Sequence, residues 1–273
     1  MTDPLTRARR LVASTDTVAG AMAELCRGAR ITITISGDPA ELADAGCGML
    51  LAGDHKNGME FVPLLAALDQ AGRPDMYITG KPFSFTYWLI GSLGQPTADL
   101  LLPIIPKTLA KDRKKIINRD LPRRLLFAGR LPTESEIIAS NADMLRRAAT
   151  LLGAKNIVSW YPAGGMMDAT KLPWQRGIGR VIKMLSRDDR ENVRIVMWRI
   201  TGYDPRRLIW ALLVQSCGLV PRTRHVTFSI GPAGTVTGLL GGGDAIDRMT
   251  DAEIAGRLRA LYVERFARVT SVG

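Results

Sequence analysis

One strand, turn and helix near the start of the chain constrain the fold more than any other feature. Residues 49–52 form an apolar run that predicts a buried strand, residues 54–58 are polar and predict a turn, and residues 59–71 have the apolar pattern of a helix. This order is the building unit of α/β folds, in which ligands lie in the crevice beyond the carboxyl ends of the strands. We therefore expect a functional site in the turn, which contains His55, one of two histidines in the chain.

The same alternation of strands and helices continues along the chain. Further strands are predicted at 31–36, 76–80, 156–160, 192–200 and 225–230. Further helices are predicted at 5–27, 83–93, 135–152, 176–186, 205–215 and 252–268. The glycine run at 238–243 lacks a Gly-Lys-Ser/Thr and opens no βαβ unit, so we predict a loop there, and residues 95–130 show no clear pattern. The sequence therefore predicts one α/β domain without a linker.

The predicted helix at 5–27 carries arginines near its start and apolar residues at mostly helical spacing. Two interpretations are open. The helix packs on the domain, or it is a basic amphipathic helix that lies on anionic lipid.

His55 and Glu60 have the spacing of a proton-transfer pair. They are five residues apart, and at about 100° per residue they would lie on different faces of a single helix. We therefore place His55 in the turn and Glu60 in the first turn of the helix, with Gly58 allowing the backbone to fold back. Imidazole takes a proton near neutral pH, and a carboxylate on its other nitrogen stabilises the imidazolium. The alternative is a histidine with a structural role.

The charge of the chain predicts an anionic partner. The net charge of +11 and the pI of about 10.0 fit nucleic acid, a phospholipid surface, a phosphorylated substrate or an acidic carrier. Basic residues gather at 7–10, 107–124 and 206–224, but aromatic residues make up only 6% and are not interleaved with them as base-stacking platforms would be. Nucleic acid is therefore the less favoured partner.

The cysteines and the N-terminus bear on the cellular compartment. Cys26, Cys47 and Cys217 are far apart and lack the spacing of metal ligands, which predicts buried small hydrophobic residues in a reducing compartment. The N-terminus has no signal-peptide pattern, and no apolar run reaches the roughly 20 residues that cross a bilayer. We expect a cytoplasmic protein that touches membranes only at their surface.

A second strand-to-turn junction, Tyr161-Pro162-Ala163-Gly164-Gly165, follows the predicted strand at 156–160. With both junctions placed, the chain resembles the glycerolipid acyltransferases, the superfamily of glycerol-3-phosphate and lysophosphatidate acyltransferases. That family has a His, four residues and an Asp after a strand, where this chain has His55 and Glu60, and a later Phe-Pro-Glu-Gly-Thr block that residues 161–165 resemble. Residues 171–178 are similar to the start of a later helix of the family, and the likeness covers roughly 31–268.

The resemblance implies both a fold and a reaction. The fold is a single domain with a central mixed sheet flanked by helices, glycerol-3-phosphate acyltransferase-like, with an N-terminal helical segment at 1–29 and the acyltransferase-like domain at 30–273. The reaction belongs to phospholipid biosynthesis and transfers a fatty acyl group from acyl-CoA or acyl carrier protein to a hydroxyl of a lysophospholipid, glycerol phosphate or related lipid acceptor. His55 would be the general base and Glu60 would orient it, at an anionic membrane surface and without a metal or cofactor.

The resemblance also implies substrate-binding residues. These are Tyr161, Pro162, Gly164 and Gly165, the two glycines through backbone amides that would stabilise an oxyanion. Arg130 is the best match for the arginine that binds the acceptor's phosphate, with Lys107 second. The apolar segments 83–90 and 208–213 would receive an acyl chain or pack in the core.

The second block departs from the family pattern. Ala163 stands where the family has glutamate, and Gly165-Met166 stands where a threonine and an arginine often follow. Two alternatives therefore accompany acyl transfer. The first is a family member that has lost the chemistry and binds lipid or a partner, and the second, less favoured, is a basic nucleic-acid-binding module.

Overall fold

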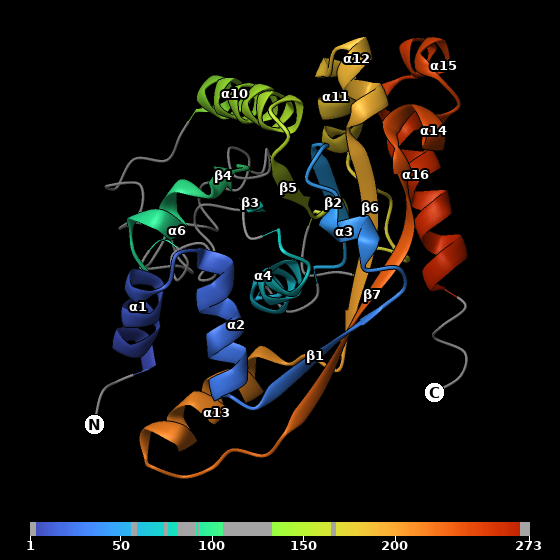
Figure 1. The fold of residues 1–273 in the computed structure, drawn as a ribbon. Coiled ribbons are helices and arrows are strands. Elements are labelled where there is room, and N and C mark those ends of the chain that lie inside the picture. The colour runs from blue at the N-terminus through green and yellow to red at the C-terminus, as the bar shows by residue number, and fades with distance from the viewer. Residues whose placement is uncertain are drawn as a thin grey trace.

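A seven-stranded sheet forms the centre of the computed structural model, which describes residues 4–55, 59–73, 76–80, 91, 93–105, 133–164 and 168–267 (Figure 1). The strands are β1 (Ile31–Ser36), β2 (Met49–Gly53), β3 (Met76–Gly80), β4 (Leu101–Pro103), β5 (Ile157–Trp160), β6 (Arg194–Thr201) and β7 (Arg224–Thr235). They lie in the order β1-β7-β6-β2-β5-β3-β4. β6 and β7 are antiparallel, and the other neighbouring pairs are parallel. The prediction of one α/β domain with a mixed sheet is therefore confirmed.

Helices cover both faces of this sheet. They are α1 (Pro4–Ser14), α2 (Val18–Gly28), α3 (Ala40–Ala43), α4 (Phe61–Gln70), α6 (Gln95–Asp99), α10 (Glu134–Gly153), α11 (Gly177–Met184), α12 (Arg187–Asn192), α13 (Pro205–Ser216), α14 (Val236–Leu240), α15 (Gly243–Arg248) and α16 (Asp251–Phe266). α1, α2, α4 and α13 contribute to one apolar core, and α10, α11 and α16 contribute to the other.

The two cores follow from the alternation of side chains along the strands. Met49 and Leu51 of β2 belong to the core under α2 and α4, whereas Leu50 and Ala52 belong to the core under α10, α11 and α16. Every residue of β2 is buried, as expected for a central strand of a sheet that is covered on both faces. The carboxyl end of β2, where His55 follows, is therefore the place where this strand can meet a ligand.

The single helix predicted at residues 5–27 is interrupted in the structure. Residues 5–27 form two helices because Thr17 caps the second one, its side chain accepting a hydrogen bond from the Gly20 N–H at 3.0 Å. The buried side chains of α2 pack against α4. The packed interpretation therefore holds for α2.

The glycine run at 238–243 is not the loop that the sequence predicts. β7 continues to Thr235, and the run belongs to α14, α15 and the turn between them. Gly241 and Gly242 form that turn with φ of 86° and 97°, a region that glycine adopts without steric cost. The glycines thus end one short helix and allow the next to begin.

The sequence analysis missed several short elements, among them α3, α6, β4 and α12. β4 has only three residues, and α12 begins after Ser186, whose side chain accepts a hydrogen bond from the Asp189 N–H. Elements this short give no periodic signal. The predicted helix at 83–93 lies mostly outside the described residues. Within the described ranges, no helix combines the length and apolar character needed to cross a membrane.

Gly179 offers a test of the packing between α11 and α16. A Cβ atom at this position would lie 2.1 Å from the Asp251 carbonyl oxygen, so Gly179→Ala must push the two helices apart. We expect a loss of about 1–3 kcal/mol in the free energy of unfolding, measured by urea denaturation. Gly256→Ala is the matched control, because nothing lies within 4 Å of the added Cβ in α16. That substitution should stabilise the protein by about 0.5–1 kcal/mol, and equal effects at both sites would contradict the packing.

Candidate active site

His55 and Glu60 are in contact at the carboxyl end of β2. His55 lies in the connection that leaves β2, and Glu60 occupies the position just before α4, which begins at Phe61 rather than at the predicted residue 59. The Nδ1 atom of His55 lies 3.2 Å from Oε2 of Glu60. The structure therefore brings the two predicted side chains together, with His55 outside the helix. Gly58 lies outside the described residues.

The pair has one partly exposed and one buried member. The side chain of His55 is 25% exposed, whereas that of Glu60 is 4% exposed. When Glu60 is ionised its oxygen can only accept, so Nδ1 then carries the hydrogen of this bond and Nε2 is the basic nitrogen. A buried carboxylate behind a partly exposed imidazole is the arrangement of a general base that takes a proton from a bound molecule.

Aromatic side chains lie beside the pair. The ring centroids of Tyr161 and His55 are 4.4 Å apart, and Trp198 meets Tyr161 edge to face at 6.1 Å. Desolvation and then the negative charge of Glu60 raise the pKa of the Tyr161 hydroxyl. Burial raises the pKa of Tyr203, with Glu60 among the nearby charges that add to the effect. Both tyrosines are therefore neutral near pH 7, and Tyr161 packs against the imidazole as an uncharged wall.

The second predicted junction is a tight turn. The Gly164 N–H donates to the Tyr161 carbonyl at 3.0 Å, and the Pro162 carbonyl accepts from the Gln175 N–H at 2.7 Å. Gly164 has a φ of 73°, which explains glycine at this position. Its amide is engaged within the turn, and this argues against the prediction that it stabilises an oxyanion. Gly165 lies outside the described residues.

A buried ionic cluster connects the two turns. Nε of Arg199 lies 3.3 Å from Oδ2 of Asp54, the residue before His55, and Nη2 of Arg199 lies 3.7 Å from Oδ2 of Asp168. Nη1 of Arg199 donates to the Phe266 carbonyl at 2.8 Å. The side chains of Arg199 and Asp54 are only 6% and 3% exposed, so water screens their attraction little.

The same cluster fixes the segment that follows the second turn. Oδ1 of Asp54 accepts a hydrogen bond from the Ala169 N–H at 2.8 Å. Arg259 of α16 donates to the carbonyls of Thr170 and Leu172, each at 2.7 Å. The backbone next to His55 and the backbone after Gly164 are therefore held against each other through Asp54.

The sequence analysis missed Asp54, Asp168 and Arg199. One signal was present, because Arg199 is a charged residue within the otherwise apolar strand of residues 195–200. A cation in such a strand needs buried anionic or carbonyl partners. The identity of those partners, 31 to 145 residues away in the chain, depends on the strand order and could not be predicted.

Several predicted residues cannot be placed or have another role. Arg130, Lys107 and the apolar segment 83–90 lie outside the described residues. The segment 208–213 divides between two environments, because Leu208 and Leu212 are buried while its other face is exposed. Core packing therefore accounts for only part of this segment.

The cysteine prediction is wrong at one position. Cys26 and Cys47 are buried as expected, but Cys217 is exposed at the end of α13. Burial raises the pKa of the Cys26 thiol to about 12, so this thiol stays protonated and unreactive near neutral pH. The three cysteines are free.

Within the described ranges, no group of three or more His, Cys, Asp or Glu side chains is arranged to hold a metal ion. No protein-family model matches the chain, and no curated protein matches it at a significant level. The resemblance to glycerolipid acyltransferases therefore depends on the residues of the two turns.

Arg199 provides a test of the ionic cluster. Arg199→Met keeps much of the apolar stem but removes the cation next to the buried carboxylate of Asp54, so we expect a loss of about 3–5 kcal/mol in the free energy of unfolding. Adding Asp54→Asn should recover part of that loss. Arg146→Met is the matched control, because Arg146 and its partner Asp143 are exposed, and it should cost at most about 1 kcal/mol in the same urea titration. Equal losses for Arg199→Met and the control would contradict a stabilising cluster.

Proposed function

We propose that the protein is an acyltransferase that moves a fatty acyl group from a thioester donor to a hydroxyl group. The observation that carries the proposal is the 3.2 Å contact between Nδ1 of His55 and Oε2 of Glu60, which leaves Nε2 as a base on a partly exposed ring. The resemblance of the two turns to those of glycerolipid acyltransferases supplies the class of reaction. On the same resemblance, we propose that the α/β domain has the fold of the glycerol-3-phosphate acyltransferases.

In the proposed step, Nε2 of His55 takes the proton of the acceptor hydroxyl while its oxygen attacks the carbonyl carbon of the thioester. The carbon–sulfur bond then breaks, and the proton passes from Nε2 to the departing sulfur. The products are an ester and a free thiol. The negative charge of Glu60 stabilises the imidazolium between the two transfers, and its hydrogen bond holds the ring with Nε2 toward the substrate.

The proposal includes the substrates and the setting. The donor is acyl-CoA or acyl carrier protein, and the acceptor is a lysophospholipid, glycerol phosphate or a related lipid. The net charge of +11 supports an anionic donor and an anionic membrane surface, which a cytoplasmic protein would meet peripherally. Arg130, with Lys107 as second choice, is the proposed contact for an acceptor phosphate.

Lipid binding without chemistry is the second candidate. Ala163, where the family has glutamate, is buried in the core under α10 and α16, and the Gly164 amide is engaged in the turn. These features support a site whose second block has become structural. Thiol release by the purified protein would exclude this candidate.

His55→Ala tests the base. We expect the rate of thiol release from acyl-CoA, in the presence of a lysophospholipid acceptor, to fall by about 10²- to 10⁴-fold, because the substitution removes the proposed general base. His225→Ala is the matched control, because His225 is the second histidine and is exposed on β7. It should leave the rate unchanged. Wild-type thiol release by His55→Ala would refute the mechanism.

Glu60→Gln tests the orienting carboxylate. The substitution keeps the size of this buried side chain but removes its charge, so kcat should fall by about tenfold or more while KM for the donor stays the same. Glu60→Asp, which restores the carboxylate found in the resembled family, should retain more activity than Glu60→Gln. A change in KM alone would assign Glu60 to substrate binding instead.

A further inference from the structure

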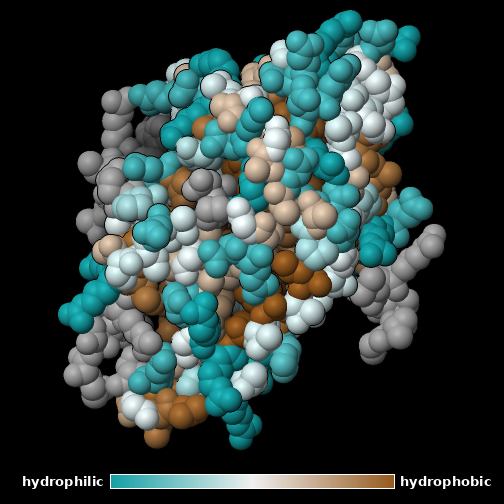
Figure 2. All heavy atoms as spheres, in the orientation of Figure 1, coloured by the Kyte–Doolittle hydropathy of each residue, from teal (hydrophilic) through white to brown (hydrophobic). Residues whose placement is uncertain are grey.

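The exposed side of α13 and the segment 217–224 after it form an unusual surface, which we call the α13 face. Its large apolar side chains are exposed by 42% to 74% and are Ile209, Trp210, Leu213, Leu219 and Val220. In Figure 2, brown atoms lie beside teal ones at the lower edge of the molecule, where Figure 1 shows α13. Exposed apolar groups gathered in one place mark a binding surface rather than ordinary exposure.

Arginines surround these apolar side chains. Arg206, Arg207, Arg222 and Arg224 are exposed, and residues 205–224 contain no aspartate or glutamate. Oδ2 of Asp204, just before α13, lies 3.5 Å from Nε of Arg207. The α13 face therefore carries a net positive charge next to apolar surface.

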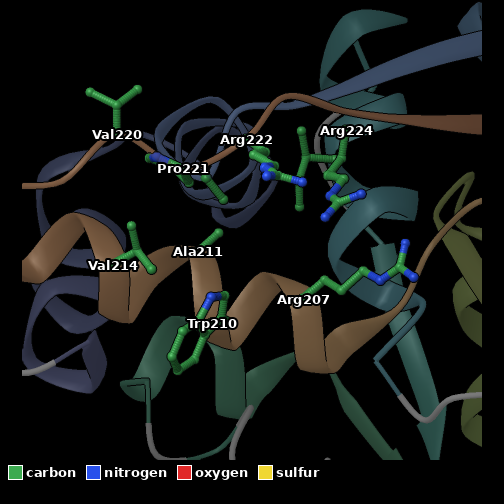
Figure 3. Close-up of a pocket in the computed structure, with 10 residues that line it drawn as sticks. Arg207, Trp210, Ala211, Val214, Val220, Pro221, Arg222 and Arg224 are labelled. Atoms are coloured by element: carbon green, nitrogen blue, oxygen red, sulfur yellow. The ribbon is translucent and has the colours of Figure 1, made fainter.

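A groove runs between α13 and the segment that leads into β7 (Figure 3). It encloses about 200 Å³, with Trp210, Val214 and Val220 on its apolar walls. Figure 3 shows Arg222 and Arg224 on the strand side of the groove and Arg207 on the helix side. Three arginine side chains around one apolar groove are suited to binding a phosphate ester, because the guanidinium group binds phosphate oxygens through several N–H donors.

The α13 face is held in place by the fold. Leu208 and Leu212, on the inner side of α13, are buried in the core shared with α1 and α2. Arg224 begins β7 and pairs in register with Ile31 of β1. The side chains on α13 and Arg224 therefore stand on fixed elements, which lowers the entropy lost when they bind.

The α13 face also lies at the end of the sheet where the candidate active site is found, the end formed by the carboxyl termini of β2 and β6. β6 and β2 are parallel neighbours, so their carboxyl ends point the same way, with His55 following β2 and α13 following β6. Tyr203, between β6 and α13, lies near enough to Glu60 for that charge to raise its pKa. A lipid that meets the α13 face is thus on the same side of the molecule as His55.

We propose that the α13 face binds the surface of an anionic phospholipid bilayer, with lipid phosphates at Arg207, Arg222 and Arg224 and with Trp210 and Val220 among the headgroups. Arginine beside exposed tryptophan and leucine is the composition of interfacial membrane-binding elements. The inference rests on the proposed function for its setting at a membrane, but the side chains that carry it lie outside the His55 site.

A bilayer fits these observations better than an acidic protein. The most exposed apolar side chains, Trp210 and Val220, lie on separate elements, on a helix and on the segment that follows it. They can enter a fluid headgroup layer without a matching pocket in a partner. An acidic carrier protein would instead need a shape complementary to the groove, and we treat it as an outcome of the test.

The test compares binding of the full chain to two kinds of vesicle. One is phosphatidylcholine alone, and the other is equal parts phosphatidylcholine and phosphatidylglycerol. We expect sedimentation with the anionic vesicles only, falling as salt rises. Arg222→Glu with Arg224→Glu should lower the partition coefficient by about tenfold or more, and Trp210→Ser with Val220→Ser should lower it at fixed charge.

The matched control is Arg146→Glu with Arg147→Glu on α10, which changes the net charge equally at exposed positions far from α13 in Figure 1. It should lower binding much less than the pair on the α13 face. Equal losses would overturn the proposed site, because only the overall charge would then matter. Circular dichroism of each variant checks that a loss of binding does not come from unfolding.

Other outcomes also decide against the proposal. If the wild-type protein ignores anionic vesicles but binds inorganic phosphate at the same arginines, the groove is a site for a free anion. If it ignores vesicles but binds acidic acyl carrier protein, the partner is a protein. Wild-type thiol release with soluble substrates would still support acyl transfer in either case, and vesicle binding by His55→Ala would support the α13 face even if acyl transfer failed.

Discussion

Arg199 is a cation in the middle of an apolar strand, and the arrangement around the candidate site depends on how its charge is satisfied. Burial of an ion costs several kcal/mol unless charges and hydrogen bonds of good geometry replace the lost water. Here Asp54, Asp168 and the Phe266 carbonyl surround the guanidinium, and they come from three separate parts of the chain. The pairing therefore brings the end of β2, the segment after the second turn and the end of α16 to one point.

Much of the fold could be predicted because its strands are apolar and its helices are amphipathic. β1 and β3 match their predicted bounds, and α10 begins at Glu134, one residue before its predicted start. The contact between His55 and Glu60 was also predictable, because it is local and follows from a turn before a helix. Arg199 and its partners were not, since their proximity depends on the placement of β6 beside β2, which no local pattern encodes.

Other errors have equally local causes. The break between α1 and α2 comes from one cap, Thr17, within a run whose apolar spacing continues across it. The glycines near 240 act through positive φ at a junction of helices, which composition cannot distinguish from a loop. Exposure of Cys217 follows from its place at the end of α13, on the side that the core does not cover.

The antiparallel pairing of β6 with β7 has a mechanical consequence for α13. The chain leaves the sheet at Thr201 and returns at Arg224, in strands that are hydrogen-bonded neighbours, so both ends of the connection are anchored to the same pair of strands. A helix attached in this way cannot swing out as a flap hinged at one end. A molecule bound to α13 is therefore held at a fixed position relative to β6. Because β6 is hydrogen-bonded to β2, its position relative to the end of β2 is fixed as well.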